Sequence, residues 1–303
     1  MKILLLGKNG QVGRELRRAL APLGELLAPG RDDVDLRDRN GLRAALSACR
    51  PDAIVNAAAY TAVDKAETDE ATASQVNALA VSTLARHARA TGALLVHYST
   101  DYVFDGTARR PYAETDAPNP RNVYGATKLA GELAIGDAGC EALVFRTSWI
   151  HSAHGRNFLK AILLLAQARP ELDVVSDQHG APTSAALVAD TTALAIRRHL
   201  AGRLPAGTYH LAAAGSTNWH AYAQYIVAGA AARGAALALA PERIRAIAAK
   251  DYPAAAERPR NSRLDTALLS RALDLRLPDW TAHVDLALDR LIELGDTAWR
   301  AKA

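Results

Sequence analysis

Apolar residues in the first half of the chain follow two alternating patterns. Residues 2–7 form a short apolar run typical of a strand buried in a parallel sheet, and further strands are predicted over residues 25–30, 52–59, 93–100 and 141–149. Between them, apolar residues recur at helical spacing over residues 11–24, 40–50 and 69–92 and in the segment that holds Tyr124 and Lys128. This alternation predicts an α/β protein built on a doubly wound parallel sheet with helices on both faces.

The alternation becomes irregular after residue 150. Helical spacing continues over residues 156–171, 187–202, 219–234 and from about 281, and strands are expected within 172–184 and 207–215. We therefore predict a first domain over residues 1–150 and a smaller second domain over 151–303. Some later segments are expected to return to the first sheet.

A glycine-rich turn separates the first predicted strand from the first predicted helix. It contains Gly7, Gly10 and Gly13, with Gln11 and Val12 between the last two. Glycines there allow a tight turn and close approach of a pyrophosphate, whose charge is met by the free N–H groups of the helix. A turn without a ligand is the alternative, but the flanking strand and helix favour dinucleotide binding. Residues 1–150 are thus predicted to be an NAD(P)-binding Rossmann domain, and 151–303 mainly a substrate-binding domain.

The end of the second strand bears on which dinucleotide is bound. Arg31 comes first and is followed by Asp32, Asp33 and Asp35. An arginine at this point favours the 2′-phosphate of NADP, whereas an acid favours the ribose hydroxyls of NAD. The sequence supports both cofactors, and a solvated charged turn is a third interpretation.

The segment NVYGATK places Tyr124 four residues before Lys128. In a helix these two positions share a face, so the phenol and the ammonium point into the same space. Thr100 ends the strand over 93–100, at the edge where open α/β sheets bind ligands. We predict that Thr100 hydrogen-bonds a substrate carbonyl, that Tyr124 donates its proton to that oxygen, and that Lys128 lowers the pKa of Tyr124. Each residue alone has a structural alternative, but the combination favours catalysis.

The composition of the chain limits which kinds of molecule it is expected to bind. The chain has 303 residues and a formal charge of +4, without a dense run of lysine and arginine, so we predict no nucleic-acid partner. A mildly basic surface suits an anionic small molecule. Cys49 and Cys140 lack metal-binding spacing and are expected to be reduced. The sequence contains no signal-peptide pattern and no apolar run of about 18 residues, which predicts a cytoplasmic protein without a membrane partner.

Eight motifs between residue 4 and about residue 266 occur in the order found in one protein family. They are LLLGKNGQVGREL, VNAAAYTAVDKAE, HYSTDYVFDG, NVYGATKLAGE, FRTSWI, DQHGAPTSAALVAD, TYHLAAAGSTNWH and RPRNSRLDT. The chain thus resembles the extended short-chain dehydrogenase/reductase family, and within it the reductases of nucleotide sugars. The resemblance implies reduction of the C4 keto group of dTDP-4-dehydro-L-rhamnose by NADPH or NADH, which gives dTDP-L-rhamnose for surface polysaccharide.

The resemblance also implies roles for single residues. Thr100, Tyr124 and Lys128 would be catalytic, and Lys128 would also hold the nicotinamide ribose. The residues implied for the pyrophosphate, the adenine end and a loop over the cofactor are Gly10, Gln11, Val12, Asp35, Leu36, Ala59, Tyr60 and Thr61. Those implied for the substrate sugar are Val63, Thr100, Asp101, Tyr124 and Trp149.

A basic cluster near the C-terminus is expected to bind the thymidine diphosphate. It consists of Arg258, Arg260, Asn261 and Arg263. Guanidinium groups form paired hydrogen bonds with phosphate oxygens. The alternative is a solvated basic loop.

Some members of the family hold magnesium at a dimer interface with two glutamates. The first matches Glu15, but the second position is Ala186 here, with Asp190 nearby. The missing second glutamate argues against a structural magnesium in this chain and, with it, against a dimer. Bound magnesium and a homodimer are kept as the alternatives.

Two other functions fit the same superfamily. An epimerase or dehydratase would keep its NAD bound, although a dehydratase normally carries Thr-Asp-Glu where this chain has Thr100, Asp101 and Tyr102. A non-catalytic regulatory subunit would bind NADP and a partner protein without turnover. The presence of Thr100, Tyr124 and Lys128 together favours an enzyme.

Overall fold

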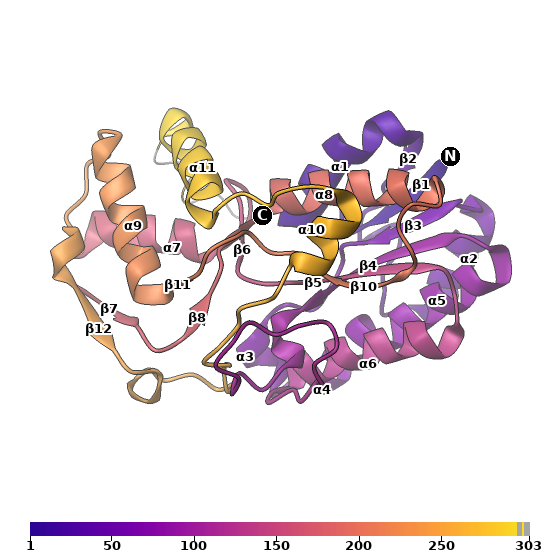
Figure 1. The fold of residues 1–303 in the computed structure, drawn as a ribbon, viewed down its shortest axis with the longest axis horizontal. Helices are drawn as coiled ribbons and strands as arrows, with labels where there is room; N and C mark the ends of the chain where they lie inside the picture. Colours follow the sequence, from indigo (N-terminus) through magenta and orange to yellow (C-terminus); the bar gives the residue numbers. More distant parts are fainter. Residues whose placement is uncertain (296–298, 300–303) are drawn as a thin grey trace.

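The computed structural model describes residues 1–295 and 299, and its centre is a parallel sheet (Figure 1). The sheet has the strand order β10–β5–β4–β3–β1–β2. Its strands are β1 (Lys2–Leu6), β2 (Glu25–Leu27), β3 (Ala53–Asn56), β4 (Leu94–Thr100), β5 (Ala142–Thr147) and β10 (Gly207–His210). All of the pairings are parallel. The predicted doubly wound sheet of Rossmann type is confirmed.

Helices cover both faces of this sheet because alternate strand residues point in opposite directions. Ile3 and Leu5 pack with one helical layer, while Leu4 and Leu6 pack with the other. The first layer contains α1 (Gln11–Leu20), α8 (Ala185–Leu200) and α10 (Ala267–Leu273). The second contains α2 (Arg39–Cys49), α5 (Ala80–Thr91) and α6 (Val123–Ala138).

A second hydrophobic core lies beside the sheet, at the left of Figure 1. It is formed by α7 (Phe158–Ala168), α9 (Trp219–Ala232) and α11 (Trp280–Leu294), together with β7 (Leu172–Val175) paired to β12 (Ile244–Ile247). Two short strand pairs connect the cores, β6 (Ile150–His151) with β9 (Thr183–Ser184) and β8 (His179–Gly180) with β11 (Thr217–Asn218). Because β10 and α8 belong to the first core, the second half of the chain contributes to both.

Several elements differ from the sequence prediction. The segment 69–92 comprises α4 (Glu70–Ser74), a π-helical turn (Gln75–Leu79) and α5. The first helix stops at Leu20, because a short 3₁₀ turn containing Pro22 follows it. The short helices α3 (Val63–Ala66) and α10 and the strand β12 were not predicted. Elements of four to seven residues show too few repeats of their hydrophobic period to be recognised.

Cys49 and Cys140 are both free and half-buried. Within the described residues, no helix combines the length and the apolar character needed to cross a bilayer.

Candidate active site

A cavity of about 1010 Å³ lies at the carboxyl ends of β1, β3 and β4. Parallel α/β sheets bind ligands at this edge. The predicted residues that line it are Gly7, Gly10, Gln11, Val12, Arg31, Asp35, Leu36, Ala59, Tyr60, Thr61, Val63, Thr100, Asp101, Tyr124, Lys128, Trp149 and Arg258. Residues spread over most of the sequence therefore meet in one place.

Close backbone contacts explain the glycines of the first turn. Gly7 has a φ of +87°, and a Cβ built there would lie 2.6 Å from the backbone nitrogen of Ala58. A Cβ on Gly13 would lie 2.0 Å from the Gly7 oxygen, so only glycine lets α1 pack this closely against the turn. Gly10 precedes α1 without a capping side chain, which leaves the first N–H groups of the helix for an anion. This cradle fits the pyrophosphate of a dinucleotide.

Gln11 connects the glycine turn to the second half of the chain. Its Oε1 accepts hydrogen bonds from Asn157 Nδ2 at 2.8 Å and from Ser152 Oγ at 3.2 Å. Asn157 also caps α7. Neither Asn157 nor Ser152 was predicted, because their link to Gln11 arises only from the fold.

Cations surround the carboxylate of Asp35, which lies in the turn region after β2. Arg37 Nε lies 2.9 Å from Asp35 Oδ2, and Arg31 Nε lies 3.6 Å from the same oxygen. The hydrogen bonds from Arg37 are the main cause that lowers the pKa of Asp35, to about 2. Lys8 reaches the same region, since its Nζ would lie 3.7 Å from a Cβ on Gly30. Sequence analysis missed Arg37 and Lys8, because charges in turns carry no recognisable spacing.

The loop after β3, which contains Ala59, Tyr60 and Thr61, is fastened by Asn77. Asn77 Oδ1 accepts the Tyr60 N–H at 2.9 Å, and its Nδ2 donates to Tyr60 O and to Thr127 Oγ1, both at 3.1 Å. Asn77 lies in the π-helical turn, a feature that often accompanies functional sites. A single asparagine inside a helical segment gave no signal in the sequence.

Thr100, Tyr124 and Lys128 meet where β4 ends. Thr100 is the last residue of that strand. Asn122 caps α6 by accepting the Gly125 N–H at 2.8 Å, which sets Tyr124 in the first turn and Lys128 in the second. A Cβ on Gly125 would lie 2.2 Å from the backbone after β4, so the helix approaches the strand end closely. Tyr124 and Thr100 line the same cavity, and the Thr100 side chain lowers the pKa of Tyr124.

Burial and the neighbours Thr100 and Asp101 set the pKa of Tyr124 in this structure, and the expected effect of Lys128 on it stays a prediction. Burial raises the pKa of Tyr124 to about 12, and the Thr100 side chain lowers it by less. Lys128 Nζ instead lies 2.6 Å from Tyr98 O and 3.1 Å from His97 Nε2. Burial also lowers the pKa of Lys128 to about 8. Helical spacing predicted that Tyr124 and Lys128 share a face of the helix. It could not predict which groups the flexible side chain of Lys128 contacts.

Asp101 is a buried acid beside the reactive hydroxyls. The residue is 3% exposed, and Thr100 Oγ1 donates to its Oδ1 at 3.1 Å. Burial raises the pKa of Asp101 to about 7, although hydrogen bonds from Ser262 and Thr100 oppose the shift. The group therefore titrates near neutral pH inside the cavity.

Trp149 forms an aromatic wall with two residues that were not predicted. Its ring stacks on Trp219, with centroids 3.5 Å apart and 13° between the planes, and Phe158 packs on Trp219 at 4.5 Å. Trp149 adopts a positive φ of 47°. A Cβ on Gly180 would lie 2.5 Å from the Trp149 ring, so that glycine makes room for the stack. Trp219 and Phe158 line both this cavity and a larger one.

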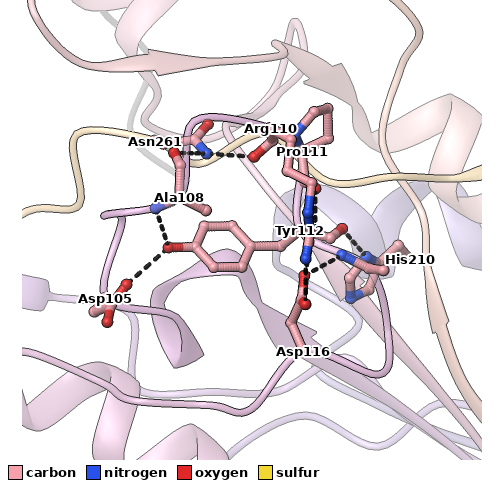
Figure 2. A network of polar contacts seen from close by, with 9 residues as sticks. Asp105, Ala108, Arg110, Pro111, Tyr112, Asp116, His210 and Asn261 are labelled. Carbon is pink, nitrogen blue, oxygen red and sulfur yellow. Dashed lines mark hydrogen bonds and ion pairs between the residues drawn. The ribbon is translucent and has the colours of Figure 1, made fainter.

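The larger cavity, of about 1840 Å³, is lined by Arg258, Arg260, Asn261 and Arg263. Asn261 Nδ2 donates to Ala108 O and Arg110 O, both at 2.8 Å (Figure 2), and its Oδ1 accepts from Arg263 Nε at 2.8 Å. Every polar atom of the Asn261 side chain is thus used within the protein. Asn261 thereby holds the loop in place, and its predicted contact with the substrate stays a prediction.

The loop over residues 105–116 is ordered by a polar network around Tyr112 (Figure 2). The Tyr112 hydroxyl donates to Asp105 Oδ1 at 2.8 Å, and His210 Nδ1 lies 3.0 Å from Tyr112 O. Arg110 forms paired contacts of 2.7 Å with Asp116. Through Asn261, this network fixes the position of the basic cluster.

Arg258 lies where the two cavities meet. Its guanidinium pairs with Asp64 at 2.6 and 3.0 Å, and the side chain retains 25% exposure. Arg260 is exposed on the wall of the larger cavity. Asp64 was missed as a partner, although it lies within the motif that predicted Val63.

The residues near Glu15 do not fit a divalent cation. Arg18 lies between the two acids, with Nη2 2.7 Å from Asp190 Oδ1 and Nε 3.4 Å from Glu15 Oε2. A guanidinium already supplies the positive charge there. Within residues 1–295, no cluster of three metal-binding side chains occurs.

The model of the RmlD substrate binding domain family matches residues 1–293. The chain belongs to this family. A dTDP-4-dehydrorhamnose reductase of Burkholderia thailandensis is 48% identical over 296 residues, which cover 96% of this chain and 99% of that protein. The predicted resemblance is thereby confirmed.

Two solved structures share the fold. The dTDP-4-dehydrorhamnose reductase of Clostridium acetobutylicum is 31% identical, with a TM-score of 0.88, and the match covers 96% of this chain and all of that one. The dTDP-4-dehydrorhamnose reductase of Bacillus anthracis, in complex with NADP, is 30% identical, with a TM-score of 0.85 over 95% of this chain and 99% of that one.

Proposed function

We propose that the protein is an NAD(P)H-dependent oxidoreductase that reduces the C4 keto group of dTDP-4-dehydro-L-rhamnose to give dTDP-L-rhamnose. The observation that carries this proposal is the meeting of Thr100, Tyr124 and Lys128 beside the glycine turn in one cavity. Its substrate class is supported by 48% identity to a dTDP-4-dehydrorhamnose reductase over nearly the whole chain.

The cofactor, when bound, supplies the hydride that reaches the keto carbon. The first N–H groups of α1 would hold its pyrophosphate, and Lys128 would hold the nicotinamide ribose. Asn77 fastens the loop with Tyr60 that lies over the cavity. The NADP in the Bacillus anthracis structure supports this use of the site.

The chain itself supplies the proton. Because the pKa of Tyr124 is about 12, its phenol is protonated at neutral pH and can donate to the oxygen that becomes the C4 hydroxyl. The Thr100 hydroxyl, which lines the same cavity, would orient the same oxygen. We assign these two residues and Lys128 as the catalytic groups.

The substrate is proposed to extend from the first cavity into the second. Trp149 would cover the apolar face of the sugar, and Arg258 would contact the diphosphate between the cavities. In this arrangement residues 1–150 bind mainly the cofactor and residues after 150 bind mainly the sugar nucleotide.

Steady-state oxidation of NADPH with dTDP-4-dehydro-L-rhamnose tests the proposal. Turnover that depends on both compounds is expected, whereas a regulatory subunit would show none. An epimerase or dehydratase would retain its cofactor through purification, which absorbance reveals, and would return the hydride.

Tyr124→Phe is the matched variant for this assay. It should lower kcat by roughly 10²-fold or more, the usual scale for loss of a general acid, while NADPH still binds. Turnover at the parental rate would show that Tyr124 is not the proton donor.

A further inference from the structure

Two buried side-chain amides line the larger cavity, and they differ in their hydrogen bonds. Asn261 is 6% exposed and Gln178 is 7% exposed. The amide of Asn261 is saturated by hydrogen bonds within the chain. That of Gln178 forms no hydrogen bond with any residue that the structure describes. Because buried amides are normally paired, the Gln178 side chain indicates a partner from outside the chain.

The backbone on both sides of Gln178 is held in place. Asp177 Oδ1 accepts a backbone N–H at 2.8 Å. The His179 N–H donates to Arg260 O at 2.8 Å, and His179 O accepts the Ser262 N–H at 2.7 Å. These bonds fix the start of the Gln178 side chain and leave its amide open to the cavity. A few fixed polar groups in a mostly apolar pocket are what orients a small ligand.

The order of the two cavities places Gln178 on the nucleoside side of the substrate. Tyr124 lines only the smaller cavity, Arg258 lines both, and Gln178 lines only the larger one. A sugar nucleotide has a matching linear order of sugar, diphosphate and nucleoside. In the proposed arrangement the C4 keto group lies at Tyr124 and the diphosphate at Arg258. The nucleoside then extends into the cavity that Gln178 lines.

The larger cavity also suits a flat ring with one polar edge. Its wall includes the apolar side chains of Ile162 and Leu165 in α7 and of Val174 in β7. Thymine has two apolar faces, and its N3–H lies between two carbonyl oxygens. A side-chain amide matches this edge, because its oxygen accepts the N3–H while its NH₂ donates to a neighbouring carbonyl.

Charged side chains on the same wall do not offer this combination. Asp105 accepts the Tyr112 hydroxyl at 2.8 Å, and Asp173 is paired with Arg245 at 2.7 Å. A carboxylate has no hydrogen to donate to the carbonyl oxygens of thymine, and a guanidinium or ammonium has no acceptor for the N3–H. The open amide of Gln178 supplies both a donor and an acceptor.

We propose that Gln178 recognises the pyrimidine base of the substrate, with Oε1 accepting the N3–H and Nε2 donating to an adjacent carbonyl oxygen. The proposal deepens the proposed function and rests on it for the identity of the nucleotide. Gln178 is thus a residue that determines specificity. A nucleotide whose base has this edge blocked leaves the buried amide unpaired, and it therefore binds more weakly.

Calorimetric titration with NADPH present tests the proposal with two probes, dTDP and its N3-methyl derivative, which has no N3–H. The parent should bind N3-methyl-dTDP roughly tenfold more weakly than dTDP. Gln178→Met keeps the length of the side chain without its amide, so it should bind dTDP roughly tenfold more weakly than the parent and should not distinguish the two nucleotides. Gln224→Ala removes a glutamine whose Nε2 donates to Pro241 O outside both cavities, and it should bind both nucleotides like the parent.

NADPH binding in the smaller cavity checks that each variant is folded, and Gln178→Ala takes the place of Gln178→Met if the latter does not fold. The proposal is overturned if the folded variant binds dTDP like the parent. It is also overturned if the variant loses affinity for dTDP and N3-methyl-dTDP by the same factor, because the amide would then act away from N3. A parent that does not bind dTDP at all would refute the proposed substrate class, and this proposal with it, so the two failures are distinguishable.

Discussion

Replacement of Arg258 should separate substrate binding from protein stability. The guanidinium lies between the two cavities and is paired with Asp64 at 2.6 Å, at side-chain exposures of 25% and 49%. Ion pairs this accessible contribute about 0–1 kcal/mol, so Arg258→Ala should have little effect on the free energy of unfolding. Its effect on a diphosphate should be larger, because a lost hydrogen bond to a charged group costs about 1.5–3 kcal/mol. This range corresponds to roughly 10- to 150-fold weaker binding of dTDP.

Asp64 gives this prediction a matched control. The carboxylate competes with a diphosphate for the same guanidinium, so Asp64→Asn should bind dTDP at least as tightly as the parent. Arg260→Ala removes an exposed cation from the wall of the larger cavity and should have a smaller effect than Arg258→Ala. The assay is calorimetric titration of dTDP with NADPH present, repeated at higher salt, which should weaken the parent more than Arg258→Ala.

Two results would refute this reasoning. If Arg258→Ala binds dTDP like the parent, the nucleotide lies elsewhere. If NADPH binding falls by the same factor, the arginine supports the whole cavity and not the substrate.

Further predictions concern the cofactor, the aromatic wall and the buried acid. Arg31→Ala should raise KM for NADPH more than for NADH, by roughly tenfold or about 1.5 kcal/mol. Asp35 is already paired with Arg37, so Arg31 can contact the 2′-phosphate. Equal changes for both cofactors would exclude that contact. Trp219→Ala should raise KM for the sugar nucleotide without changing NADPH affinity, since it removes the support of Trp149, and unchanged substrate kinetics would contradict that role. Asp101→Asn should stabilise the protein at neutral pH: because the folded pKa is raised from 3.8 to about 7, the parent loses stability as pH rises through that interval, by at most about 4 kcal/mol. Unfolding curves at pH 4 and pH 8 should show the difference between variant and parent growing with pH, and a constant difference would mean that Asp101 does not titrate there.

The sheet could be predicted because its strands and helices have strong, different periods. The run ending at Leu6 is apolar after Lys2, the strand ending at Thr100 begins with an apolar run from Ala93 to Val96, and the helices between them are long enough to show their spacing. Short elements such as α10 and β12 could not be recognised in this way. Nor could the sequence place β10 beside β5, because the paired residues, such as Tyr209 and Phe145, lie 64 positions apart in the chain.

The site was predicted where a motif carries its own geometry. The glycine turn and the pair Tyr124 and Lys128 have fixed spacings, so each implies a local arrangement. Trp219, Asp64 and Asn77 have no such spacing. They join the site only because the fold brings α9, α3 and the π-helical turn to the cavity, which one sequence does not reveal.

The structure gives the site its chemistry by leaving two buried ionisable groups without a full counter-charge. Asp101 and Lys128 each lose solvation, and burial moves the pKa of each toward pH 7, upward for Asp101 and downward for Lys128. Such groups destabilise the fold, so their surroundings must hold them in place. Asn77 and Asn261 serve that purpose, since each uses both the oxygen and the NH₂ of its amide to fasten a loop. The loops held by Asn77 and Asn261 and the buried groups Asp101 and Lys128 are therefore parts of one arrangement. The hydrogen bonds that fix the loops offset the free energy lost when the two ionisable groups are buried.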